Sequence, residues 1–464
     1  MHPASPAPTV EPFDEQLVRE LAAACEGTVL GPGEEAAAEA SAFNVAVQHT
    51  PRLVVGAASA QDVEHAVRFA TTVGAPVTVQ ATGHGIGWPC DGVLITTGRM
   101  NAVTVDPATR TARAEAGATW EQVIEAAAPH GLAPLNGSSV DVGVVGYIVG
   151  GGVGPLARTY GVAADLVRSF EVVTADGTSR QVDAVSDPDL FFALRGGKGN
   201  FAIVTAVTFE LVELTEIYGG GLFYDAADAA TVLHAYREWV QTLSRNTTTS
   251  IALINIPPFP EMPEPIRGKS VVHVRVAHVG DHAEGERIGA YLRGLAPVIL
   301  DHLGVLPYAA IASIHQDPRD PMPAFDQGGM LRELAPETVD TLLAVNAGLP
   351  LVMVELRHLG GALDDAPAHP RAFDTHGAQF GLMTLGMLVP PIAEAVPGAA
   401  AAVHAAMAPW SVPTCMPNFI GGAPTGDRVR EAFSEDTYAE LVRIKQSVDP
   451  DDVFRCSHPL TDRG

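Results

Sequence analysis

The sequence predicts an α+β fold rather than a purely parallel sheet. Residues 53–81 follow the order strand, helix, strand, which is the beginning of a β-α-β unit. Two further segments, residues 103–115 and 170–182, each contain a pair of short β-branched runs joined by a tight turn, and such turns connect antiparallel strands. Antiparallel hairpins mixed with helices are typical of the α+β class.

The opening β-α-β unit has clear boundaries. Residues 53–58 are apolar and predict a strand, and Ser59 with Asp62 three positions later predicts a capping box at the start of a helix. Apolar residues then recur at helical spacing until Gly74, where the helix should end. Residues 75–81 alternate as a second strand does.

A glycine-rich turn, GHGIG at residues 83–87, follows the second strand. In a nicotinamide-type Rossmann site a turn of this kind opens a helix. Here it continues into the turn-forming run WPCDG and then into residues 93–97, which predict a strand. The turn therefore joins two strands, which argues against a nicotinamide-dependent Rossmann enzyme.

The first 212 residues continue to mix helices with strands. Thr119 and Gln122 predict a capped helix that ends near Gly131, and the run SDPD at residues 186–189 predicts a capping box for another. Residues 201–211 form a long apolar strand, which we expect to close a first domain of residues 1–212.

The pattern changes after residue 213, and we expect a second α+β domain over residues 213–419. No internal repeat is visible. The predicted elements are helices at residues 226–243 and 281–295 and strands at residues 250–256 and 271–279.

Composition restricts the partners and the compartment. There are 54 acidic and 28 basic side chains, for a formal charge of -26, so nucleic acid and anionic membranes should be repelled. The four cysteines form no CxxC pair, which gives neither a disulfide framework nor a zinc signature. Without a signal-peptide pattern or an apolar run of about 20 residues, we expect a soluble cytoplasmic protein with a small-molecule ligand.

Three glycine clusters lie within one stretch of the first domain, at residues 83–87, 143–154 and 196–200. Glycine lets the backbone approach a ligand closely and turn its amides toward an anion. Any one cluster is explained by tight turns alone. Three clusters so close together favour a dinucleotide ligand.

At this point the sequence resembles a known family, the flavoproteins with the vanillyl-alcohol-oxidase or PCMH-type FAD fold, in the berberine-bridge-enzyme-like branch. The resemblance covers most of the chain. It is carried by the motifs VTVQATGHGIGWPCDGVLIT, VGVVGYIVGGGVGPLARTYGVAADLV, VVTADG, DPDLFFALRGGKGNFAIVT and YAELVRIKQSVDPDDVFR. It implies a PCMH-type FAD-binding domain, to which residues 420–464 return, and a substrate domain with an antiparallel sheet covered by helices.

His84 matches the family histidine whose ring nitrogen bonds covalently to the flavin, although alone it would pass for a turn residue. Ser139 stands where some members have a second, cysteine tether, and a hydroxyl does not replace that thiolate. The resemblance therefore implies a single covalent bond, through His84. Cys90 is the weaker option for a second attachment, since a buried thiol usually packs as a small hydrophobe.

The resemblance also implies an order of FAD contacts. Residues 83–87 should hold the pyrophosphate, residues 140–147 should pass along the flavin ring, and the third glycine cluster should lie near the adenosine. The implied residues are Thr82, Gly83, His84, Gly85, Ile86, Gly87, Ser139, Val140, Asp141, Gly143, Val144, Gly146, Gly150, Gly199, Asn200, Val204 and Asn418.

The chain departs from the family pattern at several of these contacts, although the spacing is kept. Before the histidine, Gln80, Ala81 and Thr82 stand where the family has an arginine and glycines, and after it Gly85 replaces a serine. Met416 replaces a tyrosine, and the late Phe-x-x-Asn motif reads Phe454, Arg455, Cys456 and Ser457. These departures lie at contacts that influence the flavin potential and its reactivity with oxygen.

A flavin oxidation needs a base near the carbon that loses hydride. In LVMVELRHLGG, strand alternation puts Glu355 and Arg357 on one face and His358 on the other. Glu355 is the first candidate base, with Tyr147 and His358 as others. The alternatives are a surface ion pair of Glu355 with Arg357 and a packed core aromatic for Tyr147.

Together these features predict an FAD-dependent oxidase that takes a hydride from an alcohol, amine, sugar or secondary metabolite and passes the electrons to O2. A dehydrogenase or monooxygenase of the same fold is the alternative enzyme. A small-molecule-binding protein without redox activity is the alternative from another class. The sequence identifies neither the substrate nor the oligomeric state.

Overall fold

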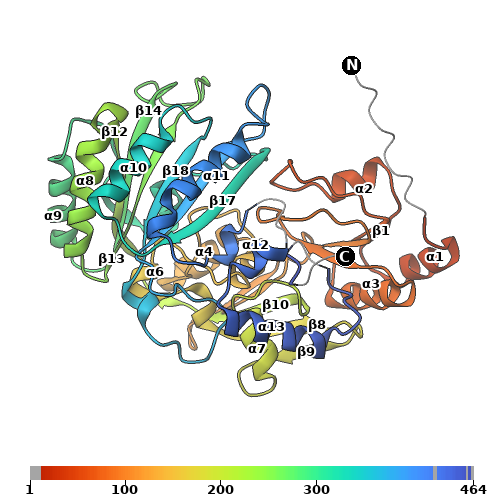
Figure 1. The fold of residues 1–464 in the computed structure, drawn as a ribbon. Coiled ribbons are helices and arrows are strands. Elements are labelled where there is room, and N and C mark those ends of the chain that lie inside the picture. The colour runs from red at the N-terminus through yellow and green to blue at the C-terminus, as the bar shows by residue number, and fades with distance from the viewer. Residues whose placement is uncertain (1–11, 422–425, 456–457, 461–464) are drawn as a thin grey trace.

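The computed structural model describes residues 12–421, 426–455 and 458–460, so Cys456 and Ser457 lie outside the described residues (Figure 1). Strands and helices are mixed throughout, and most strand pairs are antiparallel. The α+β prediction is confirmed. No helix in these ranges combines the length and the apolar character that a membrane span requires.

The N-terminal sheet has four strands in the order β1-β2-β4-β3, of which β2, β4 and β3 are parallel. Ser59 caps α3 as expected, but the Asp62 carboxylate accepts backbone hydrogen bonds from Glu26, Gly27 and Ala58 instead of completing a capping box. It thereby ties the N-terminal segment to the sheet. The elements are α1 (Glu15–Ala24), β1 (Thr28–Leu30), α2 (Glu34–Glu39), β2 (Leu53–Gly56), α3 (Ala60–Thr72), β3 (Val77–Gln80) and β4 (Val93–Thr96).

A five-stranded antiparallel sheet follows, in the order β5-β6-β10-β8-β9, and contains both predicted hairpins. Its central strand is β10, which is apolar along most of its length because both of its faces are buried. Asp187, rather than Ser186, caps α7, with Pro188 in its first turn. The elements are β5 (Val103–Asp106), β6 (Thr111–Glu115), α4 (Trp120–Ala127), α5 (Val144–Ile148), α6 (Ala157–Tyr160), β8 (Val167–Val173), β9 (Ser179–Val182), α7 (Pro188–Leu194) and β10 (Ile203–Glu210), with a small pair of β7 (Leu132–Ala133) and β11 (Val212–Glu213).

The second part of the chain is one large antiparallel sheet with the order β15-β12-β14-β13-β18-β19-β17, in which β16 also pairs with β12. Four helices cover one face, and their apolar side chains form one core cluster with those of the strands (Figure 1). The expected sheet covered by helices is confirmed. The strands are β12 (Glu216–Asp225), β13 (Thr247–Asn255), β14 (Ser270–His278), β15 (Val298–Asp301), β16 (Gly304–Pro307), β17 (Ala324–Leu331), β18 (Met353–His358) and β19 (Phe380–Met387), and the helices are α8 (Ala229–Trp239), α9 (His282–Arg293), α10 (Pro336–Asn346) and α11 (Val396–Met407).

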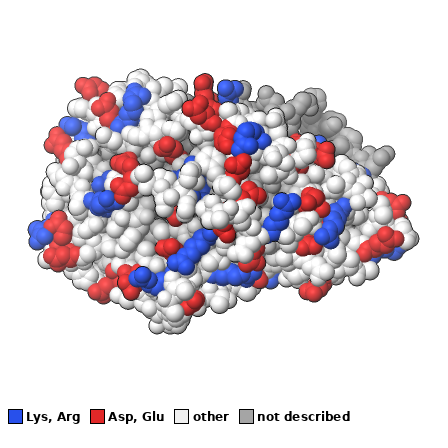
Figure 2. All heavy atoms as spheres, turned by 90° about the horizontal axis from the view of Figure 1, so that it is seen from below, with Lys and Arg blue, Asp and Glu red and all other residues white. Residues whose placement is uncertain are grey.

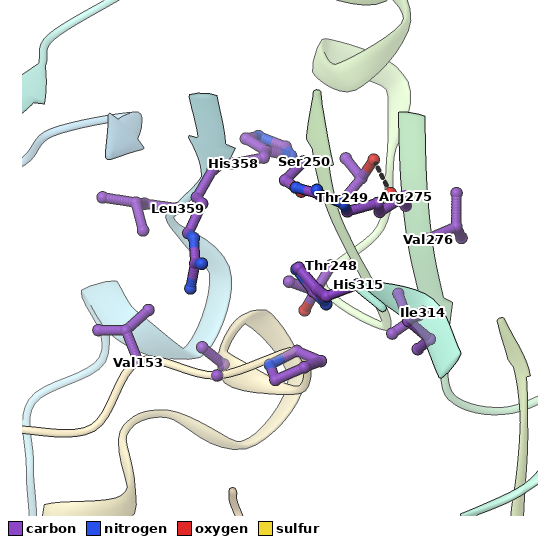
Figure 3. Close-up of a pocket in the computed structure, with 15 residues that line it drawn as sticks. Val153, Thr248, Thr249, Ser250, Arg275, Val276, Ile314, His315, His358 and Leu359 are labelled. Atoms are coloured by element: carbon purple, nitrogen blue, oxygen red, sulfur yellow. Dashed lines mark hydrogen bonds between the residues drawn. The ribbon is translucent and has the colours of Figure 1, made fainter. Parts of the chain in front are cut away.

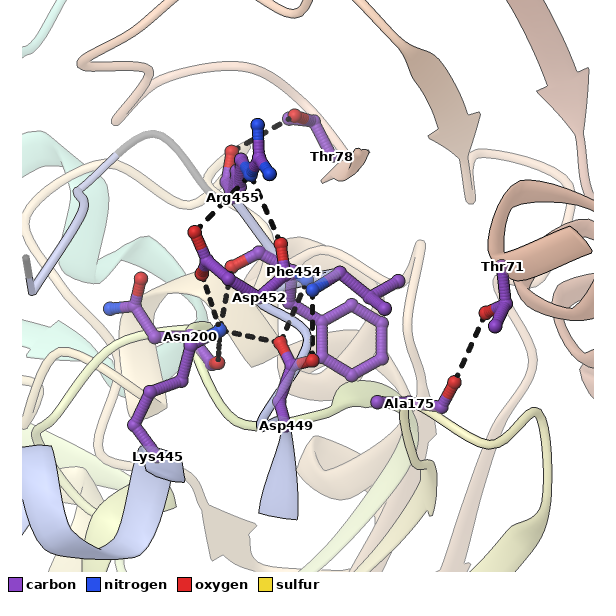
Figure 4. A network of polar contacts seen from close by, with 10 residues as sticks. Thr71, Thr78, Ala175, Asn200, Lys445, Asp449, Asp452, Phe454 and Arg455 are labelled. Carbon is purple, nitrogen blue, oxygen red and sulfur yellow. Dashed lines mark hydrogen bonds and ion pairs between the residues drawn. The ribbon is translucent and has the colours of Figure 1, made fainter. Parts of the chain in front are cut away.

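The C-terminal segment, with α12 (Gly426–Arg430) and α13 (Glu435–Val448), returns to the N-terminal part. The Lys445 ammonium donates hydrogen bonds to the backbone carbonyls of Asn200, at 2.9 Å, and Phe454, at 3.1 Å, and contacts the Asp449 carboxylate (Figure 4). Phe454 in turn pairs with Val77 at the end of β3. These contacts agree with the expected return, while the domain boundaries themselves stay a prediction.

Candidate functional site

His84 lies in the turn between β3 and β4, and three neighbours hold its ring. The ring stacks on Phe43 with centroids 3.9 Å apart, and its Nδ1 atom lies 2.8 Å from the Thr82 hydroxyl. The Nε2 atom is buried without a hydrogen-bond partner and lies 3.6 Å from the Asp141 carboxylate. A buried, unpaired ring nitrogen is costly unless something else contacts it, which marks this atom as a binding point.

Asp141 and Ser139 lie beside His84 although they are far from it in sequence. The Ser139 hydroxyl donates to the Asp141 carboxylate. Burial works against the charge of that carboxylate, but His84 and Ser139 outweigh burial, and the pKa of Asp141 falls below its usual value. A negative charge is therefore fixed close to the His84 ring.

Two glycines near His84 leave space where a side chain would otherwise stand. A Cβ atom built on Gly85 or on Gly146, in α5, would meet nothing within 4 Å. Gly83, by contrast, has a φ of +76° and would bring a Cβ to 2.5 Å from Ala42, so this position requires glycine. Gly143, the residue before α5, lies against the same turn, because its Cβ would come within 3.3 Å of Ala81.

Asn418 closes the other end of this region. Its amide nitrogen donates to the Tyr147 carbonyl at 2.9 Å, and its amide oxygen accepts from the Lys198 ammonium at 3.0 Å. A Cβ on Gly150 would lie 1.8 Å from that amide oxygen, so the approach depends on glycine. Burial lowers the pKa of Lys198 to about 8.

The third glycine cluster lies against the C-terminal segment. The Asn200 carbonyl is bound by Lys445, whereas its side-chain Nδ2 atom is buried without a partner. Val204 is a buried residue of β10, paired with Val172 of β8, so it packs in the core.

Most of the residues expected at FAD thus come together in three groups. The turn contributes Thr82, Gly83, His84, Gly85, Ile86 and Gly87, the segment at the start of α5 contributes Ser139, Val140, Asp141, Gly143, Val144 and Gly146, and Gly150 meets Asn418. Gly199, Asn200 and Val204 follow on the loop and strand beyond Lys198.

The face of the large sheet that the helices leave uncovered carries a row of polar residues. Strand register places Ser250 of β13 opposite both Arg275 of β14 and Arg357 of β18. One step along, Ala252 of β13 lies opposite Glu355 of β18. Because side chains at positions i and i+2 share a face, these five residues lie on one side of the sheet.

Glu355 is completely buried and is bound from two sides. Arg275 donates to one carboxylate oxygen at 2.6 Å, and Arg357 donates to the other at 2.7 Å. Burial alone would raise the pKa of Glu355, but the charges of Arg357 and Arg275 outweigh it and lower the pKa to about 2. The alternative of a surface ion pair is wrong, and such a carboxylate is a poor proton acceptor.

The other two base candidates differ in their surroundings. The Tyr147 phenol is buried without a partner, packs against Trp120, and has its pKa raised by burial, so it remains protonated. The His358 Nε2 atom accepts a hydrogen bond from Arg158 at 3.2 Å, and arginine can only donate. Burial lowers the pKa of His358 to about 3, so the ring is neutral and carries its one proton on Nδ1.

A pocket opens between the polar sheet face and the loop that begins at Val153 (Figure 3). It brings ionisable side chains from three separate parts of the chain together with apolar walls. The lining residues are Val153, Gly154, Pro155, Ala157, Thr248, Thr249, Ser250, Arg275, Val276, Ala277, Ile314, His315, Arg357, His358 and Leu359.

Sequence reasoning missed several of these residues. Arg275 alternates with valines in VVHVRVAH, and this alternation was the available signal. Phe43 and His315 come from irregular segments with no such pattern, so only the tertiary structure places them.

Family models match two parts of the chain. Residues 51–183 match an FAD binding domain, and residues 414–460 match the model described as berberine and berberine like. These ranges contain the His84 turn, the start of α5 and Asn418. The chain thus contains an FAD binding domain and a C-terminal segment of the berberine-like type.

Curated relatives align with this chain over different lengths. (R)-6-hydroxynicotine oxidase of Paenarthrobacter nicotinovorans is 26% identical over 433 residues, which are 89% of this chain and 92% of that protein. An uncharacterized FAD-linked oxidoreductase of Arthroderma benhamiae is 36% identical over 166 residues, 36% of this chain and only 33% of its own length. The chain thus spans about a third of the latter relative.

Solved structures share the whole fold. The 6-hydroxy-D-nicotine oxidase of Arthrobacter nicotinovorans has a TM-score of 0.81 at 23% identity, with 95% of this chain and 98% of that chain covered. The glucooligosaccharide oxidase of Acremonium strictum, whose FAD is described as 6-S-cysteinyl, 8α-N1-histidyl, has a TM-score of 0.81 at 19% identity over 96% of this chain and 100% of that chain.

The residues present fit FAD. The His84 Nε2 atom, which makes no hydrogen bond, offers a point of attachment, and the chain is open to a ligand at Gly85 and Gly146. The unpaired Asn200 amide offers a further hydrogen-bond donor at the far end.

Proposed function

We propose that this protein is an FAD-dependent oxidase in which His84 carries the flavin. The buried Nε2 atom of His84, which makes no hydrogen bond and lies 3.6 Å from the Asp141 carboxylate, carries the proposal. When bound, FAD accepts a hydride equivalent from an organic donor, and dioxygen takes up the electrons as hydrogen peroxide. The donor class is an alcohol, amine, sugar or secondary metabolite.

The chain prepares the His84 ring for attachment. Stacking on Phe43 and the contact with Thr82 restrict the ring to one orientation. If Nδ1 carries the proton and donates to Thr82, the lone pair of Nε2 faces the binding region. The Asp141 carboxylate lies 3.6 Å from Nε2 and places a negative charge beside the ring.

The glycines and Asn200 would hold the remainder of the cofactor. Backbone amides of residues 83–87 would bind the pyrophosphate, and Gly85 has no side chain to hinder its approach. Gly146 would let the ligand approach α5. Asn200 would donate to the adenosine end. Ser139 binds Asp141 and offers no thiolate, which supports a single tether.

In the substrate pocket, we propose positioning roles for two of the expected base residues. Glu355 would hold the Arg357 side chain in place rather than accept a proton, because its own charge is already neutralised from two sides. His358 would hold the Arg158 side chain, because its Nε2 atom accepts from Arg158 and its ring packs on Phe380. Tyr147 would support the loop at Gly154 from the core.

The test is chemical. The purified protein is precipitated with acid, and the pellet is examined for flavin absorbance and for a flavin-sized mass on the His84 peptide. We expect yellow pellets from the wild type and from Ser139→Ala, and a colourless pellet from His84→Ala. Flavin that stays with the His84→Ala pellet, or is released from Ser139→Ala, would overturn the tether. Peroxide formed in step with the oxidised donor would separate an oxidase from a dehydrogenase or a monooxygenase.

Two further features are part of the proposal. Partners would be a small-molecule substrate and O2, without nucleic acid or membrane. The proposed compartment is the cytoplasm, because the four cysteines of the sequence form no CxxC pair and no disulfide framework.

A further inference from the structure

Arg357 is held by one nitrogen and leaves the others available. Its Nε atom donates to Glu355 at 2.7 Å, and its guanidinium lies over the Phe419 ring, 5.1 Å from the centroid. No described residue accepts a hydrogen bond from its two terminal nitrogens, although the side chain is only 14% exposed. The residue lines the pocket, so these donors are available there.

The pocket has more positive than negative charge in its wall. Glu355 is neutralised by Arg275 on its other side, which leaves the charge of Arg357 without a second buried counterion. His315 is neutral, because burial and the charge of Arg275 lower its pKa to about 3. Asp317 is the other acidic group that acts on Arg357, and it is partly exposed, where solvent screens it.

Ser250 offers a second hydrogen-bonding group on the same face. It lies opposite Arg357 in the strand register, and its hydroxyl is buried without a partner in the described structure. Its side chain lines the same pocket as Arg357 (Figure 3). The His358 ring does not take part, because it stacks on Phe380 on the helix-covered face. The unpaired donors of Arg357 and Ser250 require an acceptor.

A positive pocket does not follow from the composition of this chain. The whole protein has a formal charge of -26, and on the face shown in Figure 2 basic and acidic side chains are interspersed. A neutral donor such as a sugar would leave the Arg357 charge unbalanced, and a cationic amine would be repelled by it.

We propose that the substrate carries a carboxylate, which binds to the terminal nitrogens of Arg357 and to the Ser250 hydroxyl. This inference rests on the proposed function, because it names the class of donor that the flavin oxidises. The planar guanidinium matches the two oxygens of a carboxylate. The apolar residues Val153, Ile314 and Leu359 would contact the carbon skeleton.

The experiment is calorimetric titration of the purified holoprotein with matched acid and amide pairs of three sizes: acetate and acetamide, benzoate and benzamide, phenylacetate and phenylacetamide. The members of a pair differ in charge but hardly in shape. We expect at least one carboxylate to bind ten times more tightly than its amide. The Arg357→Met variant should lose this preference, Arg357→Lys should keep part of it, and Ser250→Ala should reduce it.

The control is Arg319→Met, which removes an exposed arginine paired with Glu121 and should leave the preference unchanged. If no pair shows a preference for the acid, or if Arg357→Met weakens acid and amide equally, the carboxylate site is refuted. The carboxylate site is also refuted if Arg357→Met loses flavin but still prefers the acid to the amide, because Arg357 would then bind the cofactor. The calorimetric titration measures binding and needs no redox reaction. Its outcome is therefore independent of the acid-precipitation test of the His84–flavin bond, and the two proposals can fail separately.

Discussion

Arg275 Nη1 lies 2.6 Å from a carboxylate oxygen of Glu355, although an entire strand separates the two residues. Arg275 belongs to β14 and Glu355 to β18, and β13 runs between them. The arginine can reach across because the β13 residue paired with Glu355 is Ala252, whose side chain is too small to block the path. The position of the carboxylate, and through it that of Arg357, therefore depends on a small side chain on a third strand.

Enlarging Ala252 should separate this ion pair. Ala252 is completely buried, so the Leu side chain of Ala252→Leu would occupy the space that Arg275 crosses. We expect a loss of about 3–5 kcal/mol in the free energy of unfolding, the usual cost of breaking a buried pair. Urea unfolding measures this loss.

Ile251→Leu is the matched control, because Ile251 packs on the opposite, helix-covered face and keeps its volume. It should cost less than about 1.5 kcal/mol. Ala252→Leu and Glu355→Gln disrupt the same pair, so their effects should be less than additive. Strict additivity would show that Ala252 does not act through Glu355.

The stabilisation by Glu355 should depend on pH. Its pKa is about 2 in the folded protein against an ordinary value of 4.5, so the charged form is favoured by folding. The resulting stability is fully present above pH 4.5 and is lost as the pH falls from 4.5 toward 2. The difference in unfolding free energy between wild type and Glu355→Gln should therefore be about 3–5 kcal/mol at pH 7 and smaller at pH 3.5.

Denaturant unfolding at both pH values measures this difference. Glu213→Gln, which removes an exposed carboxylate from a surface pair with Arg110, should change stability by less than about 1 kcal/mol at either pH. A difference between wild type and Glu355→Gln that stays constant from pH 7 to pH 3.5 would contradict the low pKa.

Two glycine substitutions should separate cofactor binding from folding. Gly146 faces open space within α5, so Gly146→Ala should fold normally and gain up to about 1 kcal/mol of helix stability. If FAD occupies that space, the added methyl group should reduce the flavin content per chain. Gly150→Ala should instead destabilise the fold, because its Cβ would lie 1.8 Å from the Asn418 amide oxygen.

The readouts are the ratio of flavin to protein absorbance and the unfolding free energy of each variant. Normal flavin content in Gly146→Ala would place the cofactor elsewhere. An unchanged free energy of unfolding in Gly150→Ala would mean that the close contact between Gly150 and Asn418 does not stabilise the fold.

The local sequence determined the secondary structure wherever one short-range signal decided it. The Asp176–Gly177 turn formed the expected hairpin, with Gly177 at a φ of +72°, because a tight turn needs a residue that tolerates that conformation. Thr119 and Gln122 formed the expected capping box, since both partners lie within one helical turn. The same local signals located the His84 turn, and with the family motifs they indicated a flavoprotein.

Structural requirements set by residues distant in the sequence could not be predicted from the sequence. Three consecutive glycines in β12 argue against a strand, yet a Cβ at Gly220 would lie 2.0 Å from the His302 carbonyl and one at Gly221 would lie 2.1 Å from the His273 ring. These glycines are required by neighbours that only the folded sheet brings close.

The chemistry of the pocket was decided in the same way. Glu355 and Arg357 were visible as an alternating pair in one strand, but the partner that neutralises Glu355 lies 80 residues away on a strand that is not adjacent. A carboxylate in water is a base, whereas the same carboxylate between two guanidinium groups remains ionised and unreactive. The sequence determined the fold, the His84 turn and the residue types, and the register of β13, β14 and β18 decided which of those residues hold charge and which can bind a substrate.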